Sequence, residues 1–272
     1  TTGMQVGLIF VITGFATASV VSGLGAGVRR LSELNIYLAA AFMLFVLAVG
    51  PTLFILGSFL QSLGYYVSSL PRLSFWTETF ENTNWQNSWT VFYWAWWISW
   101  SPFVGTFIAR ISKGRTVREF VLGVLLLPSV VSCLWMSVFG GSAMYLELNN
   151  IGTLTDAVND NVATALFVML QNFPLTGLTS FIGIILVVVF FVTSSDSGSL
   201  VVDNLTSGGK LDSPVPQRVF WAVMEGVVAA VLMLSGGLAA IQSAAIAVGL
   251  PFAIVLLVMC YSLYQGLNRE MA

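Results

Sequence analysis

The sequence contains no histidine and very little charge. Of its 272 residues, only 8% are Asp, Glu, Lys or Arg, whereas 57% are hydrophobic. A soluble domain usually carries about 25% charged residues. This chain therefore cannot cover a water-facing surface with charge, and lipid must be its main solvent. Without histidine, no imidazole can act as a general base, a proton relay or a metal ligand.

Two further shortages narrow the possible functions. The net charge is only −2, which gives no sign of a nucleic-acid partner. The two cysteines, Cys133 and Cys260, lie in separate apolar runs and are interpreted as apolar residues outside any disulfide. An enzyme needs positioned acids, bases, nucleophiles or metal ligands. We therefore expect no enzyme, no catalytic residue and no cofactor.

Long apolar stretches predict an all-α membrane protein with about seven transmembrane helices. A span needs roughly 20 mostly apolar residues, and its backbone polar groups must be satisfied within the segment, which favours helices. The stretches that qualify are residues 5–28, 36–60, 89–111, 118–144, 176–201, 217–234 and 238–264.

The loop charges predict the orientation in the membrane. Nine of the ten cations follow odd-numbered spans, namely Arg29, Arg30, Arg110, Lys113, Arg115, Arg118, Lys210, Arg218 and Arg269. By the positive-inside rule these loops are cytoplasmic, and so is the C-terminus. The chain begins close to an apolar run without an initiator methionine, so we expect it to be a piece of a longer protein.

The segment between the second and third spans mixes large apolar side chains with polar ones. We interpret residues 65–88 as an extracellular helix lying along the membrane surface. Trp76 and Trp85 are then at the depth of the lipid headgroups, where tryptophan is enriched.

Residues 89–102, WTVFYWAWWISWSP, hold five of the nine tryptophans. On a helix, one stripe is formed by Trp89, Phe92, Trp96, Trp100 and Phe103. Trp97 lies beside this stripe, and Pro102 predicts a break in the helix near Ser99. Such rings can also mark the lipid interface, which is an equally good interpretation for Trp89.

The aromatic rings that lie deeper in the membrane, beside the predicted helix break, favour a ligand-binding role instead. A quaternary ammonium ion has no hydrogen-bond donor but is attracted to aromatic ring faces.

A second polar segment, TSSDSGS at residues 193–199, lies toward the end of a long apolar run. Serine and threonine in a helix often bond back to their own backbone, and we favour this for Ser197 and Ser199. The deeper Thr193 and Ser194 offer oxygen atoms suited to Na⁺. Asp196 either contacts water near the interface or, as an intramembrane carboxylate, takes part in gating. Glu225 also lies in an apolar run, and the sequence does not name its partner.

Several long motifs resemble the betaine/carnitine/choline transporter family. The signature region of that family is similar to WTVFYWAWWISWSPFVGTFIARISKGRTVREF, and further similarity lies in GLGAGVRRLSELN, VFGGSAMYLE and FFVTSSDSGSLVVDNL. The resemblance implies a twelve-helix fold with two inverted five-helix repeats. This chain would cover the sixth to the twelfth helix, with the end of the first repeat in residues 1–64 and the second repeat in residues 89–272.

The resemblance also implies roles for individual residues. Trp97 and Trp100 would lie closest to the trimethylammonium group of the substrate. Trp96 and Phe92 would line the outer path, and Phe103 would lie near an ion position. Thr193 and Ser194, with Phe190 one turn earlier, would form part of a sodium site, and no other metal is expected.

The function implied is secondary active transport, coupled to Na⁺, of a quaternary-ammonium compatible solute such as glycine betaine, choline or carnitine. The protein would be a multi-pass homotrimer in the bacterial inner membrane. Two alternatives stay open: a sodium-independent exchanger of the same family, and an amino-acid transporter of the same architecture. A channel is disfavoured, because polar stripes along several spans are not evident.

Overall fold

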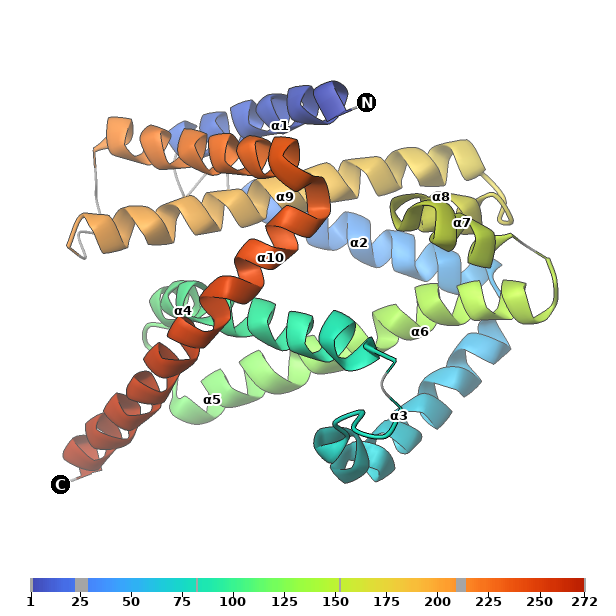
Figure 1. Ribbon diagram of the computed structural model, residues 1–272, viewed down its shortest axis with the longest axis horizontal. Coiled ribbons are helices and arrows are strands. Elements are labelled where there is room, and N and C mark those ends of the chain that lie inside the picture. Colours follow the sequence, from blue (N-terminus) through green and yellow to red (C-terminus); the bar gives the residue numbers. More distant parts are fainter. Residues whose placement is uncertain (1, 23–28, 82, 152, 209–213, 272) are drawn as a thin grey trace. The chain divides into compact units, whose positions relative to one another are not determined.

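The computed structural model describes residues 2–22, 29–81, 83–151, 153–208 and 214–271 (Figure 1). Residues 23–28 of the GLGAGVRR motif and Lys210 lie outside these ranges. All regular secondary structure in the described residues is helical. The elements are α1 (Thr2–Ser22), α2 (Arg29–Val49), α3 (Thr52–Phe75), the π-helix η2 (Asn87–Val91), α4 (Phe92–Ile111), α5 (Val117–Val121), the π-helix η3 (Leu122–Leu126), α6 (Leu127–Leu148), α7 (Leu154–Asn161), the 3₁₀ helix η4 (Val162–Thr164), α8 (Ala165–Leu170), α9 (Thr176–Thr206) and α10 (Val215–Met271).

Six helical segments of the described residues are long and apolar enough to cross a membrane, which confirms the expected all-α membrane fold. They are Thr2–Val21, Arg30–Val49, Thr52–Phe75, Val117–Leu148, Thr176–Thr206 and Val215–Glu270. The expected spans 217–234 and 238–264 both lie in the last of these. The 20-residue helix α4 is not among the six, because tryptophan, serine and proline lower its mean hydropathy.

Residues 36–60 do not form the single span expected from the sequence. Helix α2 ends before Gly50, and α3 begins after Pro51. Proline has no N–H group and disfavours helical geometry in the residue before it. The Thr52 hydroxyl donates to the Leu47 carbonyl oxygen at 2.7 Å, so the end of α2 is capped by the residue that starts α3. The repeat boundaries at residues 1–64, 65–88 and 89–272 stay predictions.

Helix α10 consists of two arms that meet at Gly237. Its φ of 62° and ψ of −143° are outside the helical region, and glycine reaches such angles without the steric penalty of a Cβ atom. From this point the second arm runs in a different direction from the first (Figure 1). The two arms therefore act as separate helices.

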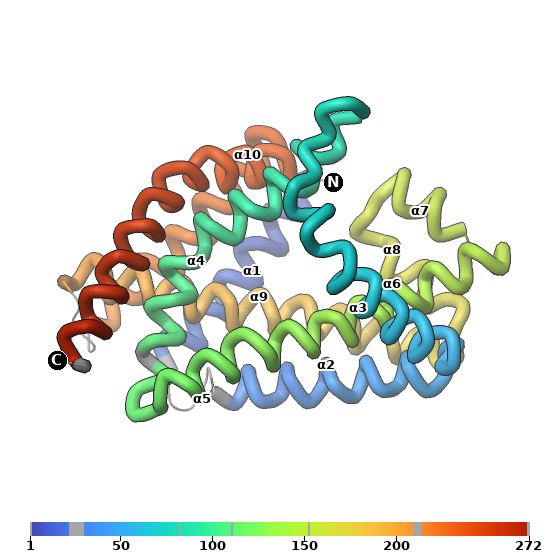
Figure 2. The backbone as a smooth tube through the Cα atoms, turned by 90° about the horizontal axis from the view of Figure 1, so that it is seen from below, coloured from blue at the N-terminus to red at the C-terminus, as the bar shows by residue number. Residues whose placement is uncertain are grey.

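The chain divides into two compact units, and the first contains residues 2–22, 77–113 and 191–271. In this unit, α1 packs along the first arm of α10 and α4 packs along the second arm (Figure 2). The C-terminal part of α9, from Phe191 onward, completes the unit. This unit holds every residue expected to bind the solute and, apart from Phe190, every residue expected to bind the ion.

The second unit contains residues 29–76 and 114–190. Helix α6 packs against both α2 and α3. The buried core is apolar and is formed by Phe42, Val46, Ile55, Val138, Leu146, Leu154, Met169, Leu170, Phe173 and Leu186. This unit is thus held together by a conventional side-chain core drawn from α2, α3, α6 and the helices that follow.

Candidate functional site

The aromatic side chains at the start of α4 form a continuous ladder. Neighbouring ring centroids lie 6.4 Å apart for Trp85 and Trp89, 6.1 Å for Trp89 and Tyr93, 5.8 Å for Tyr93 and Trp96, and 5.9 Å for Phe92 and Trp96. These spacings are within the range of favourable aromatic pairs. Successive rings of the ladder are three or four residues apart, so they are neighbours on the helix surface. The ladder shares Trp89, Phe92 and Trp96 with the predicted stripe but contains Trp85 and Tyr93 in place of Trp100 and Phe103.

Trp97 and Trp100 differ from the ladder. Trp97 is 66% exposed and Trp100 is 48% exposed. Within the described part of the chain, no aromatic ring packs against either of them. They are three residues apart on a helix, so their indoles project from the same side of α4. Both indoles are therefore partly exposed without an aromatic neighbour, whereas Phe92 and Trp96 contact neighbouring rings.

The helix break expected near Ser99 and Pro102 does not occur. Helix α4 is regular from Phe92 to Ile111 with Pro102 inside it. Pro102 cannot donate to the carbonyl of Ile98, four residues earlier. The Ser101 hydroxyl replaces that donor, since its Oγ lies 2.8 Å from the Ile98 oxygen. The prediction of an unwound segment was wrong because a side chain satisfies the carbonyl that the proline leaves free.

The second arm of α10 holds the opposite side of α4. Ser99 Oγ donates to the Ala95 carbonyl oxygen at 2.6 Å and also lies 2.9 Å from the carbonyl oxygen of Ala245 on α10. A Cβ atom on Gly249 would lie only 3.0 Å from the Ala95 side chain, so glycine permits this close approach. Phe103 packs on Phe252, with 5.9 Å between ring centroids. Phe103 is therefore half-buried in a helix contact.

The predicted ion-binding residues lie on α9. Thr193 is half-buried, and Ser194 and Phe190 are exposed. The Ser197 hydroxyl donates to the Thr193 carbonyl oxygen at 2.9 Å, as expected for a serine that bonds back to its own helix. Thr193 and Ser194 occupy neighbouring positions on a regular helix. Their side chains therefore project about 100° apart around α9.

Asp196 is completely buried, with 0% of its surface exposed. Its Oδ2 accepts a hydrogen bond from the Ser19 hydroxyl of α1 at 2.6 Å. The interpretation that Asp196 contacts water near the interface is therefore wrong for this chain. Helix α1 covers the carboxylate, a contact across 177 residues that no local pattern reveals.

Glu225 has a partner that the sequence did not name. Its Oε2 accepts a hydrogen bond from the Ser195 hydroxyl at 2.8 Å, which links the first arm of α10 to α9. Sequence reasoning singled out Glu225 as a carboxylate in an apolar run. Its partner follows only from the antiparallel packing of two helices that are separated by a loop.

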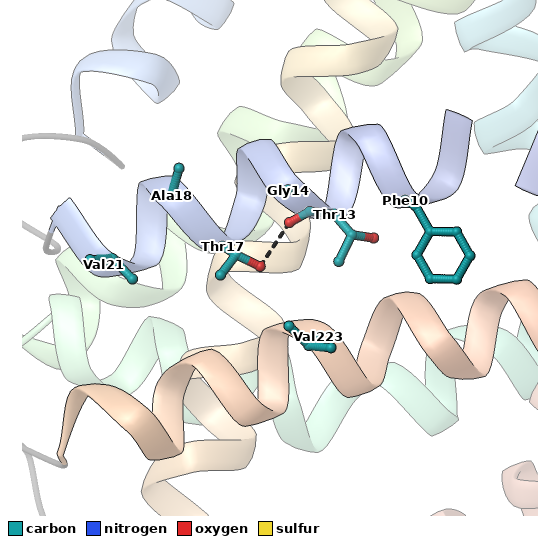
Figure 3. A pocket seen from close by; sticks show the side chains of 7 residues that line it. All are labelled: Phe10, Thr13, Gly14, Thr17, Ala18, Val21 and Val223. Carbon is teal, nitrogen blue, oxygen red and sulfur yellow. Dashed lines mark hydrogen bonds between the residues drawn. The ribbon is translucent and has the colours of Figure 1, made fainter. Parts of the chain in front are cut away.

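An apolar groove runs between α1 and the first arm of α10 (Figure 3). It is lined by Phe10, Thr13, Gly14, Thr17, Ala18, Val21 and Val223. The only polar side chains lining it are Thr13 and Thr17, and the Thr17 hydroxyl donates to the Thr13 carbonyl oxygen at 2.8 Å. Because the other lining side chains are apolar, the groove suits a hydrocarbon chain rather than a charged solute.

The loop before α4 is organised by one carboxylate. Glu78 accepts hydrogen bonds from the backbone N–H groups of Thr83 at 2.6 Å, Trp85 at 3.1 Å and Gln86 at 2.8 Å, and from the Thr83 hydroxyl. These hydrogen bonds hold the pKa of the Glu78 carboxyl below its usual range, and the bond from the Thr83 hydroxyl contributes most to this shift. The loop thereby fixes the position of Trp85, the first ring of the ladder.

Comparison with known proteins decides the family. All of residues 1–272 match the family described as BCCT, betaine/carnitine/choline family transporter. The chain belongs to this family. It is 54% identical to a glycine betaine/proline/choline transporter of Vibrio parahaemolyticus, over 98% of this chain and 48% of that protein.

Other relatives in the betaine/carnitine/choline transporter family are similar to a comparable degree. The chain is 46% identical to the glycine betaine transporter of Bacillus subtilis, over 98% of this chain and 52% of that protein. It is also 46% identical to the ectoine/glycine betaine/proline transporter of Corynebacterium glutamicum, over 99% of this chain and 45% of that protein. The chain thus spans about half the length of the curated relatives it matches.

Membership of the betaine/carnitine/choline transporter family confirms two expectations. Its members are transporters and not enzymes, and the chain is a multi-pass membrane protein. The names of these relatives mention different solutes, which include proline and ectoine beside glycine betaine. The solute-binding and ion-binding residues stay predictions.

Proposed function

We propose that this chain forms part of a sodium-coupled symporter for a quaternary-ammonium compatible solute, with glycine betaine, choline and carnitine as the candidates. The observation that carries the proposal is the pair of open indole faces on α4, at Trp97 and Trp100. A cation without hydrogen-bond donors is bound best by aromatic faces. The names of the relatives point to the same class of solute.

The division of roles along α4 follows from which rings are already engaged. Trp97 and Trp100 would contact the trimethylammonium group, because their faces are open. Phe92 and Trp96 would line the outer path, since their rings contact each other and Tyr93 in the ladder. Phe103 would lie near an ion position while it packs on Phe252.

The coupling ion would be Na⁺, bound in part by the hydroxyls of Thr193 and Ser194 next to Phe190. Neutral hydroxyl and backbone oxygens suit a small hard cation. Asp196 is proposed as a gating residue, because its bond to Ser19 would have to break if α1 and α9 separate. Sodium coupling is favoured over sodium-independent exchange by the presence of the Thr193–Ser194 pair.

The setting of the transporter is proposed from its charges and its family. The basic loops and the C-terminus would be cytoplasmic, in the inner membrane of a bacterium. The functional unit would be a homotrimer, by resemblance to the family. Proline is a second candidate solute, because the transporters of Vibrio parahaemolyticus and Corynebacterium glutamicum are named for it as well.

Uptake into proteoliposomes by the full-length protein tests this proposal. Trp97→Leu and Trp100→Leu should each raise the half-saturating concentration of glycine betaine about 30-fold, since a desolvated cation–π contact contributes about 2 kcal/mol. Tyr264→Leu is the control, because Tyr264 is a similarly exposed aromatic residue but lies on α10, outside the predicted solute site. Unchanged affinity in both test variants would refute the aromatic site.

A further inference from the structure

Two hydrogen bonds anchor the segment of α9 that follows the predicted sodium residues. The Ser195 hydroxyl donates to Glu225 Oε2 on the first arm of α10 at 2.8 Å. Asp196 Oδ2 accepts from the Ser19 hydroxyl of α1 at 2.6 Å. Consecutive residues of a helix project about 100° apart, so these bonds hold α9 from two different directions.

The surroundings of Glu225 are shaped to hold its carboxylate against α9. A Cβ atom on Gly198 would lie 3.2 Å from Glu225 Oε1, so any larger residue at this position would crowd the carboxylate. The residue after Glu225, Gly226, packs so closely on Thr13 of α1 that a Cβ atom there would overlap with the threonine side chain. Glu225 is thus placed by close packing on two helices.

Hydrogen bonds from uncharged donors to a carboxylate are stronger than those between neutral groups. Away from water, they resist rotation of the helix that carries the donor. Thr193 and Ser194 precede Ser195 by two residues and one residue on the same unbroken helix. A rotation of α9 that breaks the Ser195–Glu225 bond therefore also turns these two hydroxyls.

We propose that Glu225 is a positioning residue for the coupling ion: through Ser195, it fixes the rotation of α9 and so the direction of the Thr193 and Ser194 hydroxyls. This inference rests on the sodium-coupled function proposed above. Glu225 does not touch the ion in this arrangement. Its contribution is the acceptor oxygen that it offers to Ser195, and the serine transmits the constraint.

The test measures the dependence of glycine betaine uptake on sodium concentration in the reconstituted full-length protein. Glu225→Leu and Ser195→Ala should each raise the half-activating sodium concentration about tenfold, the equivalent of one lost hydrogen bond to a charged group. At saturating sodium, the KM for glycine betaine should stay within about twofold of wild type. The double variant should be no worse than Glu225→Leu alone, because both changes remove the same bond.

Two further variants separate positioning from general destabilisation. Glu225→Gln keeps an acceptor oxygen and should retain most of the sodium affinity. Val223→Ala, an exposed position on the same arm of α10, is the matched control and should behave as wild type. If Glu225→Leu does not reach the membrane, the sodium dependence of Ser195→Ala and of the smaller change Glu225→Gln can still be compared with that of the wild type.

The possible outcomes have distinct meanings. A wild-type protein that needs sodium, with unchanged sodium dependence in Ser195→Ala and Glu225→Leu, overturns the positioning role and leaves the proposed function in place. Equal losses of sodium and betaine affinity also overturn it, because they indicate a general structural defect. Uptake by the wild type that needs no sodium overturns both the proposed function and this inference.

Discussion

At the scale of single residues, Glu78 gives the clearest link between a charge and a local structure. Its carboxylate accepts hydrogen bonds from the backbone N–H groups of Thr83, Trp85 and Gln86, just before α4. Because its pKa in the folded protein is lowered, the charged form stabilises the loop above the usual carboxyl pKa of about 4.3. This stabilisation is lost as the pH falls below that value and through the folded-state pKa.

We therefore expect the loop to open in acid and in a charge-neutral variant. In Glu78→Gln, Trp85 should be as accessible at neutral pH as it is in the wild type in acid. In this variant the accessibility of Trp85 should not change with pH below about 5. Quenching of tryptophan fluorescence by iodide measures this. Glu81→Gln, an exposed neighbour in the same loop, is the control. Equal quenching in wild type and Glu78→Gln at pH 7 would show that the carboxylate does not organise the loop.

Two features of α4 show how far the roles of single residues can be predicted from sequence. Residue spacing predicts a stripe of rings on α4, and the structure shows ring contacts along part of it, between Phe92 and Trp96, while Phe103 packs on Phe252 instead. The predicted break at Pro102 is absent, because the Ser101 side chain donates to the carbonyl that proline leaves free. Whether a serine makes this bond depends on its rotamer and neighbours, so spacing alone could not distinguish a break from a continuous helix.

At the scale of elements, α3 raises the main question of topology. Arg30 lies in the first turn of α2, and Arg115 lies in the loop after α4. By the positive-inside rule both positions are on the cytoplasmic side, so only two of the helices α2, α3 and α4 cross the membrane. Of the six candidate spans, α3 has the lowest mean hydropathy, and the family resemblance makes α4 a membrane helix. We infer that α3 lies along the outer surface.

Cysteine labelling tests the placement of α3. In a background that lacks Cys133 and Cys260, Leu53→Cys and Phe75→Cys should both react with a membrane-impermeant maleimide added to whole cells. Both positions are strongly exposed, at opposite ends of α3. Lys113→Cys should react only after the membrane is opened. If only one end of α3 reacts in whole cells, α3 crosses the bilayer and this topology is wrong.

At the scale of the whole molecule, the proposed coupling has an electrical consequence. Glycine betaine carries no net charge, so its entry with Na⁺ moves positive charge inward. Each charge gains about 2.3 kcal/mol per 100 mV of inside-negative potential, which corresponds to about 50-fold accumulation. Exchange of one zwitterion for another moves no charge.

Imposing a potassium diffusion potential on proteoliposomes should therefore accelerate sodium-dependent uptake of glycine betaine. Choline is unsuitable for this measurement, because it is itself a cation and responds to the potential without any coupling ion. Liposomes with the ionophore but equal potassium on both sides are the control. Uptake of glycine betaine that ignores the potential would favour the sodium-independent exchanger.

The sequence by itself determined the solvent, the class of secondary structure and the candidate residues. Scarce charge, apolar runs of membrane length and aromatic spacing are local properties of the chain, so they can be interpreted without coordinates. Only the tertiary structure decided that α2 and α3 are separate, that Asp196 is buried under α1 and that Glu225 bonds to Ser195. The two carboxylate contacts join different helices, so no residue pattern within one helix specifies them. The end of α2 is local, but its cap depends on the backbone geometry at Pro51.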